Sequence, residues 1–413
     1  MEFGPIIKYY RLKSGITQAE LADGICSIPH LSKIENNAYS VNKETAALLM
    51  ERLGLDMNEE VERYGILQER LEEFTDAIFY YELDKAKEIK DQLELDEEYY
   101  SKTNLVQLYH IYMARFFTTQ YDFNSVESHL SIVEKNRANL SPVEELLYRH
   151  VYGSVLFAKG KHRESLDYLL GIRNSTASIN SYISMKELSY QIALCYSVLG
   201  QRDNSIPYAH EALQFYIEKN NFIRTLHSQI LLAINYESMN LFEEAKKLYI
   251  SILRNTKLLN LENLYYHNLY NYSLLLISTK EFKKAIINIE KCISYFEEDS
   301  EDHILAIIEL VKIFIEVDNK NPEIDSYLKK LNTFKNTKDV PKKMKLLIKE
   351  VELNLAGDQD KQINFLEKEV MPFLEKNNDE LFLRHYSLIL AKMYDSKGSL
   401  SKALSYYRKY NIN

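Results

Sequence analysis

The sequence predicts an all-α protein in which a small helical domain precedes a right-handed α-solenoid of seven to eight helical hairpins. Three observations support this fold class. The 413 residues include only 11 glycines and 7 prolines, which is a composition typical of helices. Small residues recur at a spacing of 40, at Ser165, Ser205, Ala245 and Ala285, and a period of this length is typical of stacked helical units. Residues 1–57 carry helix start and stop signals outside this period.

Residues 1–57 are predicted to form a domain of four or five short helices. Thr17 and Glu20 have the spacing of a capping box, which opens the second helix. Gly24 supplies the turn after it, and Ser27 caps a third helix that tolerates Pro29 in its first turn. Two short helices around a glycine turn, in a domain of this size, are typical of a helix-turn-helix.

The motif R-x-x-x-G-I-T-Q-A-E-L-A, followed by L-S-K-I-E-N, resembles the Cro/repressor-type helix-turn-helix. The resemblance implies that this domain binds double-stranded operator DNA with its third helix in the major groove. It implies a structural ion pair between Arg11 and Glu35, and a phosphate contact by Gln18 at a helix N-terminus. The other expected DNA contacts are Ser27, Ile28, Pro29, His30, Ser32 and Lys33.

Two features of the third helix depart from the common pattern. Leu21 and Leu31 lie ten residues apart, one fewer than usual, so the preceding turn is expected to be tighter. Ile28 and Pro29 are poor hydrogen-bond readers, so thymine-methyl contact and DNA shape are expected to matter more than usual. His30 has a second interpretation, as a solvated surface imidazole.

Residues 58–100 are predicted to form acidic linker helices. The segment from residue 56 to residue 100 carries sixteen acidic and five basic side chains, whereas the net charge of the whole chain is −9. A solvated helical face accounts for this excess better than a binding surface does.

Residues 101–413 are predicted to form the repeats, used for peptide binding and oligomerisation. In each unit two small residues flank a turn, as Ala233 and Ala245 flank Asn240. Small residues let two antiparallel helices approach closely, and hairpins must stack to bury their apolar faces. The pattern resembles the tetratricopeptide repeat, lengthened from about 34 residues to about 40. It is lost over residues 300–380, where two degenerate hairpins are expected, and returns before Ala403.

The two parts together resemble the peptide-responsive quorum-sensing regulators of the Rap/Rgg/NprR/PlcR/PrgX superfamily. The sequence ADGICSIPHLSKIEN around the turn, the chain length and the repeat period are most similar to NprR. The resemblance implies a transcriptional regulator switched by a short imported signalling peptide. It also implies a homodimer, or a tetramer when the ligand is bound.

The peptide is expected on the concave face, which the first helix of each hairpin lines. Positions facing this groove recur every 40 residues, with a cation at one end, an apolar middle and amides towards the other end. The resemblance implies an asparagine that holds the peptide backbone, for which Asn271 is the best match, and Arg115 suits a carboxylate. Taken singly, each position is equally compatible with an ordinary surface residue. The predicted peptide-binding residues are Arg115, Gln191, Leu194, His227, Leu231, Ile234, Asn235, His267, Asn268 and Asn271.

Enzymatic motifs are missing from the sequence. It contains no Walker loop, HExxH, GxSxG or clustered His/Cys/Asp set, so neither catalysis nor a metal or other cofactor is expected. Three distant cysteines suggest neither a disulfide framework nor a zinc site. The first residues lack the pattern of a signal peptide, and Glu309 and Lys312 interrupt the longest apolar stretch, residues 303–317. A cytoplasmic protein without membrane contact is expected.

Two alternative functions stay open. A bifunctional, Rap-like protein would also bind or dephosphorylate a phosphorelay response regulator through residues 66–100, with Gln68 or Gln92 positioning a water. A mobile-element repressor would instead be controlled by a protein antirepressor.

Overall fold

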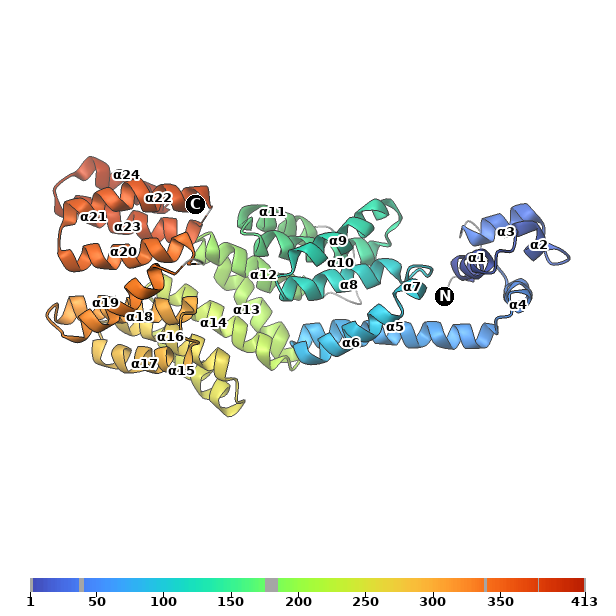
Figure 1. Cartoon of the computed structure of the whole chain (residues 1–413), viewed down its shortest axis with the longest axis horizontal. Helices are drawn as coiled ribbons and strands as arrows, with labels where there is room; N and C mark the ends of the chain where they lie inside the picture. Colours follow the sequence, from blue (N-terminus) through green and yellow to red (C-terminus); the bar gives the residue numbers. More distant parts are fainter. Residues whose placement is uncertain (1–2, 37–40, 175–184, 338–339, 378, 412–413) are drawn as a thin grey trace. The chain divides into compact units, whose positions relative to one another are not determined.

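The computed structural model describes residues 3–36, 41–174, 185–337, 340–377 and 379–411, and within them the chain is helical without any strand (Figure 1). This confirms the predicted fold class. Internal contacts divide the chain into two compact units. Unit 1 comprises Met1–Ala158 and Gly171–Ser184, and unit 2 comprises Lys159–Leu170 and Met185–Asn413.

The N-terminal module of unit 1 contains the four helices α1 (Phe3–Lys13), α2 (Gln18–Ala22), α3 (Ile28–Glu35) and α4 (Lys43–Arg52). The capping box before α2 is present: the Thr17 side chain accepts from the Glu20 amide, and the Glu20 carboxylate accepts from the Thr17 amide at 2.7 Å. Ser27 caps α3 by accepting from the amide of His30. The module buries one apolar side of each helix, including Ile7, Leu21, Leu31, Ile34 and Leu49.

The predicted linker region forms α5 (Met57–Tyr80), α6 (Leu83–Leu95) and α7 (Glu97–Tyr100). Leu67, Leu71 and Phe74 line the buried side of α5. Most of the acidic side chains of the region are exposed, whereas Glu60 is only 7 % exposed. Unit 1 continues with α8 (Val106–Thr119), α9 (Phe123–Lys135), a single 3₁₀ turn (Arg137–Asn139) and α10 (Pro142–Ala158), and α11 follows (His162–Arg173).

The regular part of unit 2 starts with α12 (Met185–Val198) and α13 (Arg202–Glu218). It continues with α14 (Phe222–Ser238), α15 (Phe242–Leu258), α16 (Glu262–Ser278) and α17 (Phe282–Tyr295). The four helices from α13 to α16 are each 17 residues long, and successive helices from α13 to α17 begin 20 residues apart. One hairpin therefore corresponds to the 40-residue period of the sequence.

Links of three residues join these regular helices, and the middle residue of each link is left-handed. Its φ is +54° at Asn220, +61° at Asn240, +54° at Asn260 and +60° at Lys280. At Asn240 the amide donates to the carbonyl of Glu237, and the next amide donates to that of Tyr236. This is the Schellman arrangement, which satisfies the last carbonyls of a helix and reverses the chain.

Small residues lie where paired helices cross. Ala193, Ser205, Ala233, Ala245 and Ala285 are all 0 % exposed. Because these side chains are short, the helix backbones can approach each other, as the sequence period predicts.

The C-terminal part of unit 2 is less regular. It contains α18 (Glu301–Val317), α19 (Glu323–Lys335), α20 (Lys342–Ala356), α21 (Gln359–Phe365), a π-helical turn (Leu366–Val370), α22 (Met371–Lys376), α23 (Glu380–Ser396) and α24 (Leu400–Asn411). Two helical hairpins, α18–α19 and α20–α22, thus fill the stretch in which the repeat pattern is lost. Their interior consists of large side chains such as Ile307, Leu310 and Leu347. Among the described residues, no helix combines the length and apolar character needed to cross a bilayer.

Candidate functional site

The residues predicted to contact DNA lie at and just after the N-terminus of α3. Ser27, Pro29 and Lys33 are exposed, and the Ile28 side chain is 49 % exposed. His30 and Ser32 are half-buried. Leu31 and Ile34 of the same helix are buried, so α3 is fixed by one side while its predicted contact residues remain accessible.

An ion pair connects α1 to α3 inside the module. The Arg11 guanidinium donates to Glu35 through Nε at 2.6 Å and through Nη2 at 2.9 Å, with the side chains 10 % and 1 % exposed. The hydrogen bond to Glu35 raises the pKa of Arg11. Gln18 Nε2 donates to the same carboxylate at 2.8 Å. The amide predicted to meet a phosphate is thus engaged within the protein, and its phosphate contact stays a prediction.

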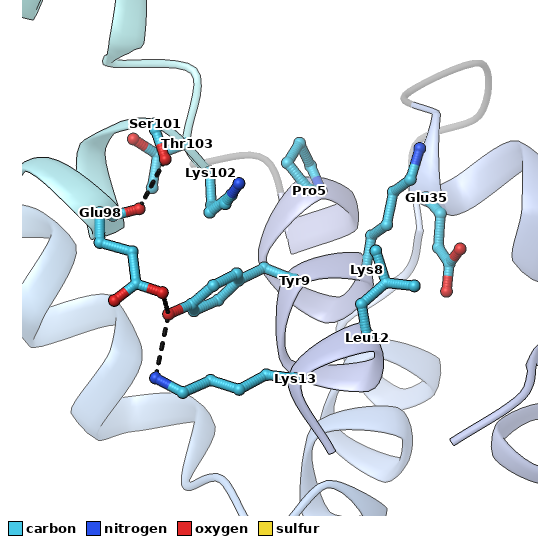
Figure 2. A pocket seen from close by; sticks show the side chains of 10 residues that line it. All are labelled: Pro5, Lys8, Tyr9, Leu12, Lys13, Glu35, Glu98, Ser101, Lys102 and Thr103. Carbon is cyan, nitrogen blue, oxygen red and sulfur yellow. Dashed lines mark hydrogen bonds between the residues drawn. The ribbon is translucent and has the colours of Figure 1, made fainter. Parts of the chain in front are cut away.

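A cavity of about 580 Å³ lies between α1 and α7 within unit 1. Figure 2 shows Tyr9 pointing from α1 towards Glu98, whose carboxylate accepts from the Tyr9 hydroxyl at 2.6 Å. Lys13 donates to the same hydroxyl at 3.1 Å. The Tyr9 hydrogen bond, and then the charge of Lys13, lower the pKa of Glu98. Three ammonium groups, those of Lys8, Lys13 and Lys102, belong to residues lining this cavity.

A second contact holds α1 to the linker helices. Glu60, on α5, accepts hydrogen bonds from the Tyr10 hydroxyl at 3.2 Å and from the Tyr99 hydroxyl at 2.8 Å. The Arg63 guanidinium lies 4.1 Å from the centre of the Tyr99 ring. Sequence reasoning missed this contact, although two adjacent tyrosines in a short amphipathic helix indicate a second packing surface. The module is therefore anchored to α5 and α7 by hydroxyl–carboxylate bonds.

Six predicted peptide-binding residues lie half-buried on the first helices of consecutive hairpins, α12, α14 and α16: Gln191, Leu194, His227, Ile234, His267 and Asn271. Burial, and then the charge of Arg224, lower the pKa of His227 to about 3, so this imidazole is neutral at pH 7. His267 Nε2 lies 3.8 Å from the Asp302 carboxylate.

Three of the predicted peptide-binding residues are interior instead, and this corrects the sequence prediction. Asn235 is 0 % exposed; it accepts from Ser197 and donates to Ser205, each at 2.8 Å. Asn268 is also 0 % exposed and donates to the carbonyl of Tyr249 at 3.2 Å. Leu231 is 4 % exposed within an apolar cluster of α12, α13 and α14. The two asparagines bond protein groups at helix crossings and are closed to a ligand in this arrangement.

Arg115 lies on α8 in unit 1, whereas the other predicted peptide-binding residues belong to unit 2. It is half-buried, and its Nη1 donates to the Thr75 hydroxyl of α5 at 3.3 Å. Its contact with a peptide carboxylate stays a prediction.

The C-terminal hairpins contain a charged cluster that the sequence did not predict. Lys312 donates to Glu309 at 3.1 Å and lies 3.9 Å from Glu350, which accepts from the Tyr386 hydroxyl at 2.9 Å. Burial opposes the charge of Lys312, but the two carboxylates outweigh it and raise the pKa of the ammonium group. Glu309 and Lys312, which interrupt an apolar run, were the signal available in the sequence.

Within the part of the chain that the structure describes, no three His, Cys, Asp or Glu side chains come together as a metal site. The arrangement offers an exposed surface at the start of α3 and half-buried polar side chains along the first helices of the hairpins.

Comparisons with known proteins match both parts of the chain. The helix-turn-helix family matches residues 7–59. The transcriptional activator NprA of Geobacillus stearothermophilus is 23% identical over 403 residues, 94% of this chain and 97% of that protein. Response regulator aspartate phosphatase I of Bacillus subtilis (strain 168) is 20% identical over 358 residues, 84% of this chain and 90% of that protein.

Solved structures share the fold of most of the chain. The apo form of the quorum sensor NprR from B. thuringiensis has a TM-score of 0.66 at 21% identity, covering 86% of this chain and 98% of that one. NprR in complex with its cognate peptide NprX has a TM-score of 0.65 at 19% identity, covering 83% and 96%. A Rap protein complexed with Competence and Sporulation Factor has a TM-score of 0.66 at 17% identity, covering 84% and 97%.

Proposed function

We propose that the chain belongs to the superfamily that includes NprR and the Rap proteins, and that it is a transcriptional regulator switched by a short signalling peptide; the helix-turn-helix match and the full-length similarity to NprA support this. One observation carries the proposal: a helix-turn-helix module with an accessible α3 N-terminus precedes hairpins whose first helices carry polar side chains. The module would bind operator DNA, and the hairpins would bind the peptide.

The DNA contact proposed here combines one cation with small and apolar groups. Lys33 would meet a phosphate, and Ser27 and Ser32 would donate to phosphate or base oxygens. Ile28, half-exposed at the start of α3, would contact a thymine methyl group. A homodimer would place two such helices in half-sites one helical turn, or a multiple of it, apart.

Selection from a random duplex pool with the full chain tests this proposal. We expect enrichment of paired half-sites, affinity that falls steeply with salt, and weaker binding by a variant with Ser32→Ala and Lys33→Ala. Lys87→Ala removes an equal charge from α6 and is the matched control, which should bind as wild type. Retention of DNA binding after deletion of residues 1–57 would contradict the proposal.

The proposed peptide site uses the half-buried residues of α12, α14 and α16. The backbone of an extended peptide loses its hydrogen bonds to water on binding, so the site must supply side chains that replace them. The amides of Gln191 and Asn271 each offer donors and an acceptor. Leu194 and Ile234 would take an apolar side chain of the peptide. The contact of Arg115, which belongs to unit 1, with an acidic group is a separate prediction and no part of this site.

Affinity selection from a pool of synthetic peptides of five to ten residues, read by mass spectrometry, tests the peptide site. For a retained peptide, Asn271→Ala should weaken binding about 10- to 100-fold, because a buried peptide group loses its partner. Asn288→Ala, on the second helix α17, is the matched control. Arg115→Ala should weaken only acidic peptides. Wild-type affinity of Asn271→Ala would move the site elsewhere.

The response of DNA binding to peptide would be a coupling between two distant sites. Asn271→Ala should therefore keep DNA binding without peptide and lose the effect of added peptide. A protein antirepressor, the alternative effector, would be indicated if no peptide were retained while DNA binding remained intact.

One observation favours a second activity towards a response regulator. Gln68 lines a cavity of about 260 Å³ in unit 1, together with Glu72, Asn104 and Tyr112, and donates to Glu72 at 3.1 Å. Gln92 lies on α6, outside this set. We propose that Gln68 orients a water towards an aspartyl phosphate. Faster dephosphorylation of a phosphorelay response regulator, lost in Gln68→Ala and kept in Gln92→Ala, would support this activity, and no acceleration by the wild-type chain would exclude it.

A further inference from the structure

The first and last hairpins of unit 2 touch at a glycine. Gly200 is the middle residue of the link between α12 and α13, and Arg384 lies near the start of α23. A Cβ added at Gly200 would stand 1.6 Å from Arg384 Nη1 and 2.4 Å from its Cζ. The Arg384 side chain is 15 % exposed. The guanidinium therefore occupies the space that any other residue at position 200 would fill.

The electrostatic surroundings of His162 relate the same two regions. His162 begins α11, and Asp379 and Glu380 lie at the start of α23. Burial lowers the pKa of His162, and the carboxylates of Glu380 and Asp379 act on it in the opposite direction. Both acidic groups therefore lie near the imidazole. The N-terminus of α23 thus contacts Gly200 and also lies near His162 at the beginning of unit 2.

These contacts close a circuit of packed helices. From α12 to α18 each helix packs on the next, α18 packs on α20, and α20 is joined through α21 to α23. An open row of hairpins changes curvature by small rotations between neighbours. A row whose ends are joined resists these rotations, because each one would separate the ends.

Glycine at position 200 is explained by this contact better than by the backbone. Its φ is +74°, but the equivalent link positions Asn220, Asn240 and Lys280 adopt the same left-handed region with a side chain. Gly160 has a φ of +76° in the link between α10 and α11, and a Cβ there would meet nothing within 4 Å. What distinguishes position 200 is the arginine.

We propose that Arg384 and Gly200 form a clasp that closes unit 2 and holds the first helices in the arrangement that the peptide site requires. The second half of this statement rests on the proposed function, whereas the clasp itself does not. A preorganised site binds more tightly because less ordering remains to be done on binding. Opening the clasp would therefore weaken the peptide site without altering any residue in it.

Asparagine substitutions separate the side-chain clash from backbone strain, because asparagine tolerates the left-handed conformation. Hydrogen exchange of the full chain, without peptide, is compared for Gly200→Asn, Arg384→Gln and the control Gly160→Asn. We expect exchange in the first turns of α23 to rise at least about fivefold in the first two variants. Gly160→Asn should leave it unchanged. The double variant should exchange no faster than Arg384→Gln alone, because Gly200→Asn breaks a contact that Arg384→Gln already removes together with the ion pair to Glu380.

Two results would overturn the clasp: Gly200→Asn behaving as Gly160→Asn does, or independent, multiplying effects of the two substitutions.

The peptide pool used for the proposed function then tests the role of the clasp in peptide binding. With peptides that the wild type retains, both clasp variants should bind about tenfold more weakly, and equal binding by an opened variant would overturn the role. If the wild type retains no peptide, the proposed function fails, while hydrogen exchange still decides on the clasp.

Discussion

The N-terminal module and the regular hairpins of unit 2 are both built from short-linked helices, but different interactions define their structures. In the module a single carboxylate, Glu35, collects donors from Arg11 and Gln18 and so positions three helices. In the hairpins the helices are positioned by side-chain size, with Ala245 and its equivalents fully buried at the crossings. The module should therefore respond to the loss of one polar group, and the hairpins to a change in volume.

The largest effect is expected from Glu35→Ala in the module. The substitution leaves the largely buried Arg11 guanidinium without its partner, which costs about 3–5 kcal/mol. Thermal scans should show a lower unfolding temperature for the module and an unchanged unfolding temperature for unit 2. Glu44→Ala, an exposed residue at the start of α4, is the control. If Glu35→Ala left the unfolding temperature of the module unchanged, the module would not depend on this ion pair.

The hairpins should be most sensitive at a crossing. Ala245→Leu inserts three carbon atoms between α14 and α15 where no space is available, with a cost of roughly 1–3 kcal/mol. Ala245→Ser should cost much less, because serine occupies the equivalent buried positions 165 and 205. Urea unfolding of unit 2 measures the difference. Equal stability of the two variants would show that residue size does not set this crossing.

Substitutions at the contact between the module and the linker helices test whether the module is held to α5 and α7 by hydrogen bonds. Tyr99→Phe removes a buried 2.8 Å bond to Glu60 and should cost roughly 1–2 kcal/mol. Tyr10→Phe removes a longer, partly exposed bond to the same carboxylate and should cost less. Resistance of α1 to limited proteolysis should fall in the same order. The reverse order would mean that Tyr10, rather than Tyr99, anchors Glu60.

The smallest effect is expected in the links. Lys280 has a φ of +60°, which is unfavourable for an ordinary side chain. Lys280→Gly should raise stability by roughly 0.5 kcal/mol after the entropy of the unfolded glycine is subtracted. Asn260→Gly, at the equivalent link, should gain less because asparagine tolerates this conformation. A lower urea midpoint for Lys280→Gly would show that its side chain contributes a contact that outweighs the strain.

The sequence predicted the features whose signals are local or periodic. The capping box of Thr17 and Glu20 and the small residues at the crossings each depend on spacing alone, and the structure contains them. The prediction for Asn235 and Asn268 failed because these residues neighbour the recurring groove positions without occupying them. Each follows a half-buried residue by one position, and one position turns a helical side chain by about 100°, from the predicted groove into the interior.

The partners in contacts between distant, unequal hairpins could not be predicted from spacing. Lys312 lies near the carboxylate of Glu350 on α20, and this carboxylate also accepts a hydrogen bond from Tyr386 on α23. Arg384 meets Gly200 from the other end of unit 2. No repeat relates these positions, so only the folded arrangement brings them together. The same holds for Tyr9 and Glu98, which belong to separately predicted regions.

The helices α13 to α16 have equal lengths, and the three-residue links between them share one left-handed conformation, so their ends are interchangeable. Joining Asn220 to Leu261 would remove α14 and α15 and leave a link of the same length before α16. Recombination between repeats could thus shorten or lengthen this protein by whole hairpins while preserving every remaining helix. Such a change would nevertheless alter the number of hairpins between Gly200 and Arg384. The regular spacing therefore allows whole hairpins to be gained or lost, whereas the contact between Gly200 and Arg384 requires a fixed number of hairpins.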